Sequence, residues 1–412
     1  MIDSLKFYGK KNKNIYLDNA ASTIPFQKVK DTADNFLYNY GSLHRGSGSN
    51  SQKSTTAYED AREIILKTLD GTENDCVIFT SNTTDAINKF TLIYPFEEDD
   101  VVLISDVEHT SNLLPWLKHA KVEFLETENF KINPKNVEKA IIKNPNIKIV
   151  SLTQASNITG YITDIPQIYK ICKEHNVLLF VDASQYAPHY KPSLKYCDFI
   201  AYCGHKMYAP YGAGVLAGRK DILRNDKYSL TGGGNVLYID KFGKPYYKDV
   251  PFMHEAGTPN GLGAVTMACS HKILFEEIGE EMLEEHNKKL LKAIKEIGEL
   301  LPKSDYEVYF YNEITNRTPL LIINNKKKSN KKTVKLLNSP IGGLNKNIFC
   351  REGAFCAYSI LEQLFPELKN EKPIVKNELN PKYSLIRLSG GLTTSVEDIY
   401  YTYEKLKIIN NF

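Results

Sequence analysis

Residues 199–216 read FIAYCGHKMYAPYGAGVL, and the lysine in this stretch determines how the rest of the chain is interpreted. The apolar run at its start predicts a buried strand, which Gly204, His205 and Lys206 follow directly. A lysine amine in such a place is unfavourable unless it is paired or has reacted. Two interpretations are open at this point. Either the chain reaches the surface there, or the amine of Lys206 is a nucleophile that forms a Schiff base with a carbonyl cofactor.

Similar short apolar runs occur upstream, and helical patterns separate most of them. They lie at residues 77–81, 100–105, 147–154 and 177–183. Continuous apolar strands between helices predict a mostly parallel sheet that is covered on both faces. We therefore expect an α/β fold in which a ligand binds beyond the carboxyl ends of the strands.

The pattern changes after residue 260, where a long helical stretch precedes several short strands and further helices. A chain of 412 residues is long enough for two domains. We expect an N-terminal segment at residues 1–15 that packs with the small domain, and a large ligand-binding domain at residues 16–260. A linker helix and a smaller α+β domain are expected at residues 261–412.

Charge and cysteine content narrow the classes of partner. The formal net charge is +3, which gives no support to a nucleic-acid partner. The seven cysteines show no CxxC or metal-ligand spacing, which is typical of reduced thiols in a cytoplasmic protein without a metal site. No apolar run approaches the roughly 20 residues that a membrane helix requires. We therefore expect a cytoplasmic protein that binds neither nucleic acid nor membrane.

A carboxylate and the lysine fall at the same edge of the predicted sheet. Asp182 ends the strand VLLFVD, and Lys206 follows the next strand along the chain. Pyridoxal phosphate requires both groups, because a carboxylate keeps the pyridine nitrogen protonated so that the ring can accept electrons from the substrate. Taken alone, an aspartate at a strand end is more typical of a turn or cap.

Other polar residues follow the neighbouring strands. Thr83 and Thr84 stand where a helix begins, which is a favourable place for a phosphate group. His109 follows the strand at 100–105 and is a candidate to stack on a cofactor ring and to move protons. Gln185 follows Asp182 closely and is a candidate to hydrogen-bond a ring hydroxyl. Each of these residues also has an ordinary structural reading, as a helix cap or a loop side chain.

Nine short motifs occur in order: YLDNAAST, LHRGS, TTDAIN, EHTSN, SNITG, VDASQ, GHKMYAPYGAG, EAGTPN and REGAFCA. Together they resemble the class V (NifS/SufS-like) pyridoxal phosphate enzymes, and they are most similar to group II cysteine desulfurases. The resemblance extends from about Tyr16 to Ile399. It implies the fold type I of pyridoxal phosphate-dependent transferases, a homodimer, and L-cysteine or a related amino acid as substrate.

The resemblance also implies roles for individual residues. Lys206 is the Schiff-base lysine, Asp182 the pyridinium partner and His109 the catalytic residue that stacks on the ring. Thr258 is expected to reach the phosphate of the neighbouring subunit. The full set expected to bind the cofactor is Thr83, Thr84, His109, Asn157, Asp182, Gln185, Cys203, His205, Lys206 and Thr258. The set expected to bind substrate is His44, Arg45, Asn157 and Arg387, of which Arg387 holds the α-carboxylate.

Cys356 determines which reaction is expected. It lies in REGAFCA just before a helical pattern, and R-x-G-x-x-C-A is the form found in group II desulfurases. The likeness implies that its thiolate attacks the substrate sulfur, leaving alanine and a persulfide whose sulfur passes to an acceptor protein. Arg351 and the following helix are expected to favour the thiolate. The structural alternative is a small buried hydrophobic residue, as most free cysteines are.

Four departures from the family pattern keep other activities open. Cys203 stands where a serine or threonine is usual, and Gly48 where many desulfurases have a second histidine. AFC replaces the common HHC before the nucleophile, and GGLTTSVED lacks the usual Tyr-Asn-Thr. The alternatives are a C–S lyase acting on a cysteine conjugate or selenocysteine, an epimerase, or an aminotransferase. A cofactor-bound regulatory protein without turnover is a further alternative.

Overall fold

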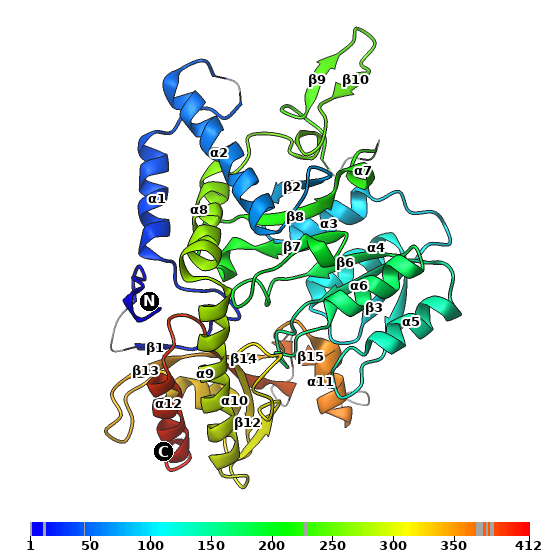
Figure 1. Cartoon of the computed structure of the whole chain (residues 1–412). Helices are drawn as coiled ribbons and strands as arrows, with labels where there is room; N and C mark the ends of the chain where they lie inside the picture. The colour runs from blue at the N-terminus through cyan, green and yellow to red at the C-terminus, as the bar shows by residue number, and fades with distance from the viewer. Residues whose placement is uncertain are drawn as a thin grey trace.

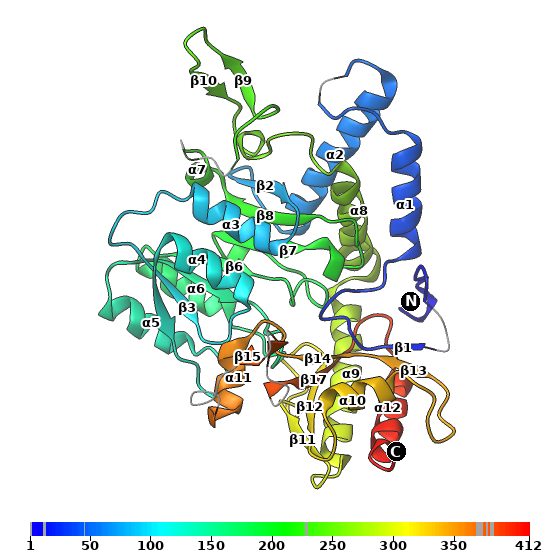
Figure 2. The same ribbon diagram turned by 180° about the vertical axis from the view of Figure 1, so that it is seen from behind.

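The computed structural model describes residues 2–10, 14–44, 46–225, 227, 230–367, 374–375, 378–379 and 383–412. Figure 1 shows a large α/β body above a smaller body that contains the C-terminal segments, and Figure 2 shows the same arrangement from behind. A hairpin of β9 (Val236–Ile239) and β10 (Pro245–Tyr247) projects away from the large body in both views. None of the helices in these described ranges is long and apolar enough to cross a membrane.

The large body is built on a seven-stranded sheet with the order β2-β8-β7-β6-β5-β3-β4. Within it β8 runs antiparallel to both of its neighbours, and the other adjacent pairs are parallel. The mostly parallel sheet predicted from the apolar runs is therefore confirmed. The strands are β2 (Asp75–Thr80), β3 (Val101–Ser105), β4 (Lys121–Leu125), β5 (Ile147–Thr153), β6 (Leu178–Asp182), β7 (Phe199–Cys203) and β8 (Gly214–Arg219).

Helices cover both faces of this sheet and bury two separate apolar cores. Tyr58, Ala61, Ile65 and Leu69 are almost fully buried against one face, as the helical spacing of these residues predicts. Trp116 and other buried apolar side chains form the core on the opposite face of the sheet. The first face is covered by α1 (Gln27–Tyr38), α2 (Ser49–Thr68), α5 (Pro134–Lys143), α6 (Ile165–Glu174) and α8 (Gly261–Lys272), and the second by α3 (Thr83–Ile93), α4 (Leu114–His119) and α7 (Lys220–Leu223).

The small body contains an antiparallel sheet with the order β11-β12-β17-β14, which packs against helices. A capping box between Ser395 and Asp398 begins its last helix. Its elements are β11 (Tyr306–Tyr309), β12 (Leu320–Asn325), β14 (Arg351–Gly353), β17 (Leu385–Ser389), α9 (Glu280–Leu300), α10 (Asn330–Leu337), α11 (Tyr358–Leu364) and α12 (Val396–Ile409). Short strands are β1 (Asn14–Tyr16), β13 (Asn347–Phe349), β15 (Ile374–Val375) and β16 (Glu378–Leu379).

The linker is not one continuous helix. A π-helical turn at Ile273–Ile278 follows α8, and Gly279 then takes a left-handed φ of 81° before α9 begins. In Figures 1 and 2, α9 runs from the large body into the small one. At the other end of the chain, Ile2, Leu5 and Phe7 pack against the large core, whereas β1 pairs with β13 in the small body.

Candidate active site

The carboxyl ends of β5, β6 and β7 open into a cavity of about 520 Å³. Residues from the small body close one side of it. Of the residues predicted for cofactor and substrate, the following line this cavity: Thr83, Thr84, His109, Asn157, Asp182, Gln185, Cys203, His205, Lys206, Cys356 and Arg387. Thus residues that are widely separated in sequence meet in one place.

Asp182 and Lys206 come from neighbouring parallel strands. Asp182 is the last residue of β6, is 3% exposed, and accepts a hydrogen bond from the backbone N–H of Ser184 at 2.9 Å. Lys206 ends the 3₁₀ turn Gly204–Lys206 that follows β7. The backbone N–H of Thr23 donates to the carbonyl of His205 at 3.0 Å and so fixes this turn. The strand order therefore places a carboxylate and an amine at one cavity.

Hydroxyl groups gather at the start of α3, where the helix dipole favours an anion. Thr83 Oγ1 and Ser184 Oγ lie 2.8 Å apart, and Thr84 Oγ1 and Ser111 Oγ lie 2.7 Å apart. Strand β8 lies so close to this helix start that only glycine fits at position 214. A Cβ on Gly214 would lie 2.6 Å from the carbonyl carbon of Asn82. This donor set is suited to a phosphate group.

Cys203 lines the same cavity and is 2% exposed. Burial alone would raise the pKa of its thiol. The hydrogen bond with His205 and the positive charge of Lys206 outweigh burial, and the pKa is lowered from its ordinary value. The side chain that departs from the family pattern is therefore more readily ionised than a thiol in water.

His109 begins the 3₁₀ turn Thr110–Asn112 and lines the cavity. Burial and the nearby charge of Lys206 lower its pKa to about 4, so the ring is neutral near pH 7. The N–H of Ser111 donates to His109 Nδ1 at 3.1 Å. The proton of the neutral ring therefore lies on Nε2.

The neighbouring residue Glu108 was not predicted as part of the site. Burial raises its pKa to about 8, although it accepts hydrogen bonds from Ser105 Oγ, Asn112 Nδ2 and the backbone N–H of Thr153. These contacts connect the end of β3 to the end of β5. Glu108 thus fixes the segment that carries His109, without lining the cavity itself.

Cys356 lies in the turn between β14 and α11. Both Phe355 and Cys356 have left-handed φ angles, of 54° and 55°, which few side chains adopt. The turn is held to the large body, because Thr110 N–H donates to the Cys356 carbonyl at 2.8 Å and Asn157 Nδ2 to the Phe355 carbonyl at 2.7 Å. Cys356 is exposed, whereas the other six cysteines are buried or half-buried. The alternative of a small buried hydrophobic residue is therefore wrong for Cys356.

Arg387 projects from β17 and is 3% exposed. Burial lowers its pKa to about 10. Its Nη1 donates to the Asn157 carbonyl at 3.0 Å, and its guanidinium carbon lies 4.5 Å from the centre of the Phe355 ring. Its Nε is buried without a hydrogen-bond partner in the described residues. The Arg387 side chain also lines the cavity, where a cation can meet a carboxylate.

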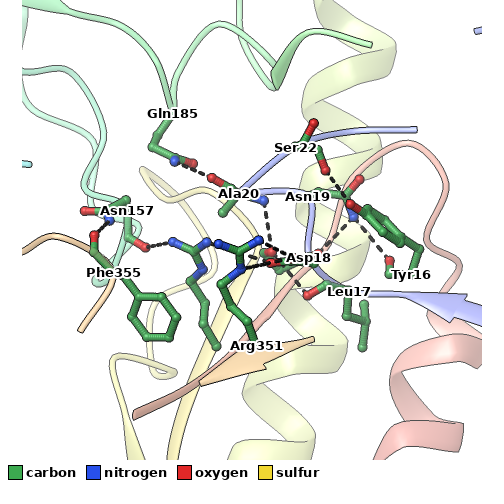
Figure 3. Close-up of polar contacts among 12 residues, drawn as sticks. Tyr16, Leu17, Asp18, Asn19, Ala20, Ser22, Asn157, Gln185, Arg351 and Phe355 are labelled. Atoms are coloured by element: carbon green, nitrogen blue, oxygen red, sulfur yellow. Dashed lines mark hydrogen bonds and ion pairs between the residues drawn. The ribbon is translucent and has the colours of Figure 1, made fainter. Parts of the chain in front are cut away.

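Arg351 is paired rather than free. It donates from Nε to both carboxylate oxygens of Asp18 at 3.0 Å and from Nη2 to Oδ2 at 2.9 Å. Figure 3 shows this bidentate pair, with Asn157 and Phe355 beside it. That Arg351 favours the Cys356 thiolate stays a prediction, and Asp18 offsets the charge of Arg351 in this structure.

The two amides expected at the ring hydroxyl also contact the protein. Gln185 Nε2 donates to the Ala20 carbonyl at 2.7 Å (Figure 3), and Asn157 donates to Phe355 as described above. Both side chains line the cavity and retain a carbonyl oxygen that can accept a hydrogen bond. Their contact with a cofactor remains a prediction.

His44 and Thr258 do not reach this cavity. They line a second cavity of about 500 Å³ near the base of the projecting hairpin. His44 Nε2 lies 2.8 Å from Glu59 Oε1. Arg45, the remaining residue expected to bind substrate, lies outside the described residues.

The donor set fits pyridoxal phosphate. The cavity joins an amine, a buried carboxylate, an aromatic ring and hydroxyl groups at a helix start, and these four features match the aldehyde, the pyridine nitrogen, the ring face and the phosphate.

The family model described as aminotransferase class-V matches residues 15–401. The chain belongs to this family. A probable cysteine desulfurase from Borreliella burgdorferi is 33% identical over 304 residues, which are 69% of this chain and 71% of that protein. This relative agrees with the resemblance carried by the nine sequence motifs.

Solved structures of two cysteine desulfurases have the same fold as this chain. The apo structure of cysteine desulfurase from Thermococcus onnurineus NA1 has a TM-score of 0.83 at 26% identity, covering 97% of this chain and 96% of that one. The cysteine desulfurase CsdA from Escherichia coli, in its S-sulfonic acid form, has a TM-score of 0.81 at 23% identity and covers 98% of this chain and 96% of that one. The expected transferase fold is therefore confirmed.

Proposed function

We propose that this protein is a pyridoxal phosphate-dependent cysteine desulfurase that converts L-cysteine to L-alanine and transfers the sulfur to Cys356. The observation that carries the proposal is the meeting of Lys206, Arg387 and the exposed Cys356 at one cavity. A thiol on the small body thus lines the same cavity as the amine that would hold the cofactor. The names of the curated relatives support the same activity.

The cofactor would be held by side chains at the strand ends. Lys206 would bind it covalently, Asp182 would pair with its ring nitrogen, and His109 would cover the ring. Thr83, Thr84 and His205 would hold the phosphate at the start of α3. When bound, the cofactor supplies the electron sink for charge that develops at the substrate Cα.

Arg387 would orient the substrate through its carboxylate. Its buried guanidinium lines the cavity and is a suitable partner for a carboxylate, and the Phe355 ring and the Asn157 carbonyl fix its position. Asn157 also donates to the Phe355 carbonyl. One residue therefore contacts both the arginine that would bind substrate and the turn that carries Cys356.

Cys356 would receive the sulfur. Its thiolate would form an S–S bond with the substrate sulfur while the bond between that sulfur and the substrate Cβ breaks. The Cβ would then take up a proton. The products are alanine and a persulfide on Cys356, so that no external oxidant is needed. His109 Nε2 would carry a proton near this centre, because the low pKa of His109 keeps the ring neutral.

Product analysis tests the proposed reaction. Purified holoenzyme with L-cysteine and a thiol reductant should release alanine and sulfide in equal amounts. Pyruvate as the main product would replace the proposal with a C–S lyase. Racemised cysteine would indicate an epimerase, and amino-group transfer an aminotransferase. A cofactor-loaded protein that turns over neither cysteine, selenocysteine nor cysteine conjugates would be a binding or regulatory protein.

We propose further that the active unit is a homodimer. Thr258 and His44 line a cavity apart from their own chain's active site, which suits a contribution to the partner's site. Thr258→Ala should then weaken cofactor retention several-fold in dialysis, because the phosphate loses a donor. Thr72→Ala, at an exposed position on the same body, is the control. A fully active monomer in light scattering would contradict the dimer.

Cys203→Ser should bind the cofactor more tightly, on the order of several-fold, because a hydroxyl is a stronger donor than a thiol. The lowered pKa of Cys203 also gives a pH dependence. As pH rises through that pKa, a thiolate repels the phosphate, so the affinity of wild type relative to that of Cys203→Ser should fall. Absorbance titration of each apoprotein with cofactor from pH 6.5 to 9 measures the two affinities and their dependence on pH. Equal affinities at every pH would contradict this effect.

The sulfur acceptor and the location belong to the same proposal. The exposed Cys356 is accessible to an acceptor protein, which would take the sulfur and regenerate the thiol. All seven cysteines are free thiols, which supports a reducing compartment such as the cytoplasm.

A further inference from the structure

A single hydroxyl group bridges the turn that carries Lys206. Thr23 Oγ1 donates to the carbonyl of His205 at 3.2 Å and accepts from the backbone N–H of Tyr208 at 2.6 Å. It therefore contacts the backbone on both sides of Lys206. Thr23 is 4% exposed, so water has little access to these hydrogen bonds. Thr23 belongs to YLDNAAST, a motif in which the proposed reaction has used no side chain.

The same motif supplies two further donors to the His205 carbonyl. They are the backbone N–H of Thr23 at 3.0 Å and Ser22 Oγ at 3.1 Å. Ser22 is itself held in place, because the Tyr16 hydroxyl donates to its carbonyl at 2.7 Å (Figure 3). Without the Thr23 hydroxyl, two of the three contacts to this carbonyl would remain. We therefore expect the turn to stay folded when that hydroxyl is removed.

Tyr208, on the other side of the turn, depends on the hydroxyl more strongly. Its φ of 63° lies in the left-handed region, which is unfavourable for a large side chain unless the surroundings fix it. Its ring stacks on Phe26 at 4.6 Å between centroids, and its hydroxyl accepts from the backbone N–H of Leu392 at 2.9 Å. Removing the Thr23 hydroxyl would take the acceptor from a buried N–H group, which is costly.

The position of this backbone determines where the Lys206 amine can reach. Lysine has a flexible stem of four carbons, so the stem does not fix the amine by itself. The amine must add to the aldehyde carbon of pyridoxal phosphate, which forms a C=N bond and releases water. Such a step loses rate steeply when the reacting groups are misplaced.

We propose that Thr23 is a positioning residue for Lys206, and that its hydroxyl holds the turn where the amine meets the cofactor aldehyde. Thr23 itself does not line the cavity, so it acts through the backbone of the turn. This inference rests on the proposed function for the role of Lys206 as the amine that binds the cofactor. It goes further by assigning a role to a hydroxyl outside the cavity.

A matched pair of ligands tests the inference. Pyridoxal phosphate and pyridoxamine phosphate share the ring and the phosphate, but only the first has an aldehyde that can react with Lys206. Thr23→Val replaces the hydroxyl with a methyl group of similar size. At saturating pyridoxal phosphate, bond formation in the full-length apoprotein should slow by at least about fivefold. The dissociation constant for pyridoxamine phosphate should stay unchanged. Stopped-flow absorbance measures the rate, and absorbance titration measures the constant.

Three further variants separate position from stability. Thr23→Ser retains the hydroxyl and should restore the wild-type rate. Thr23→Ala, which is too small to clash with its neighbours, should show the same loss of rate as Thr23→Val. The control is Thr402→Val, which removes a similarly buried hydroxyl that donates to the Asp398 carbonyl at 2.7 Å in α12. This control should leave both the rate and the dissociation constant unchanged.

A purely structural role for Thr23 gives a different result. Thr23→Val would then lower the melting temperature and weaken pyridoxamine phosphate by the same factor as it slows the reaction, which would overturn the inference. A wild-type rate in Thr23→Val would overturn it as well. Wild-type protein that forms no bond at Lys206 would refute the proposed cofactor site together with the inference. A product other than alanine would refute only the proposed reaction, because these measurements require no turnover.

Discussion

Cys356→Ala should release almost no alanine from L-cysteine, with a loss of at least about 10²-fold, while cofactor and substrate still bind. Lys206, Asp182 and Arg387 hold the cofactor and the carboxylate in our proposal, and none of them needs the thiol. The C–S bond should persist, because the nucleophile that forms the S–S bond is gone. Absorbance changes on adding cysteine measure binding, and alanine analysis measures turnover.

Cys350→Ala is the matched control for this variant. Cys350 precedes the same motif, but burial raises the pKa of its thiol well above the ordinary value, and it does not line the cavity. The Cys350→Ala variant should therefore retain near wild-type turnover. Wild-type protein treated with cysteine and then an alkylating agent should carry one additional sulfur on the Cys356 peptide. Wild-type rates in Cys356→Ala, with pyruvate as product, would instead identify a β-lyase.

Much of the fold could be predicted because its signals are local. The apolar runs are continuous since their strands are buried on both faces, as β3 and β7 show. Tyr58, Ile65 and Leu69 share one helical face, so the spacing alone identifies the buried side of α2. The break in the linker was missed, although Gly279 in EEIGEE is a helix-stop signal of the kind that interrupts a long pattern.

The site was predictable where topology alone brings residues together. Asp182 and Lys206 follow adjacent parallel strands, so their meeting requires only the strand order. The pair between Asp18 and Arg351 joins residues 333 positions apart, and no local pattern predicts it. Glu108 was missed for a different reason. A single sequence does not reveal that this carboxyl is buried, and its raised pKa follows from that burial.

Lys206→Ala should abolish covalent attachment of the cofactor and reduce turnover by at least about 10²-fold, the lower range for loss of a general acid–base group. Lys206 is the lysine that meets Asp182 and His109 in the cavity. Borohydride reduction of wild-type holoenzyme followed by peptide mapping should place the pyridoxyl group on the Lys206 peptide. After the same borohydride treatment, the variant should lose the cofactor on gel filtration under denaturing conditions, whereas wild type should retain it as a reduced secondary amine.

Lys405 provides an internal control for this labelling. Burial lowers its pKa to about 8, so its amine is more often neutral and nucleophilic than that of an ordinary lysine. Its Nζ donates to the carbonyls of Leu337 and Lys346 at 2.8 and 2.7 Å in the core of the small body, away from the cavity. If a depressed pKa were enough for labelling, the Lys405 peptide would carry the pyridoxyl group as well. Labelling confined to Lys206 would show that a depressed pKa is not enough for attachment, and labelling at Lys405 alone would refute the proposed cofactor site.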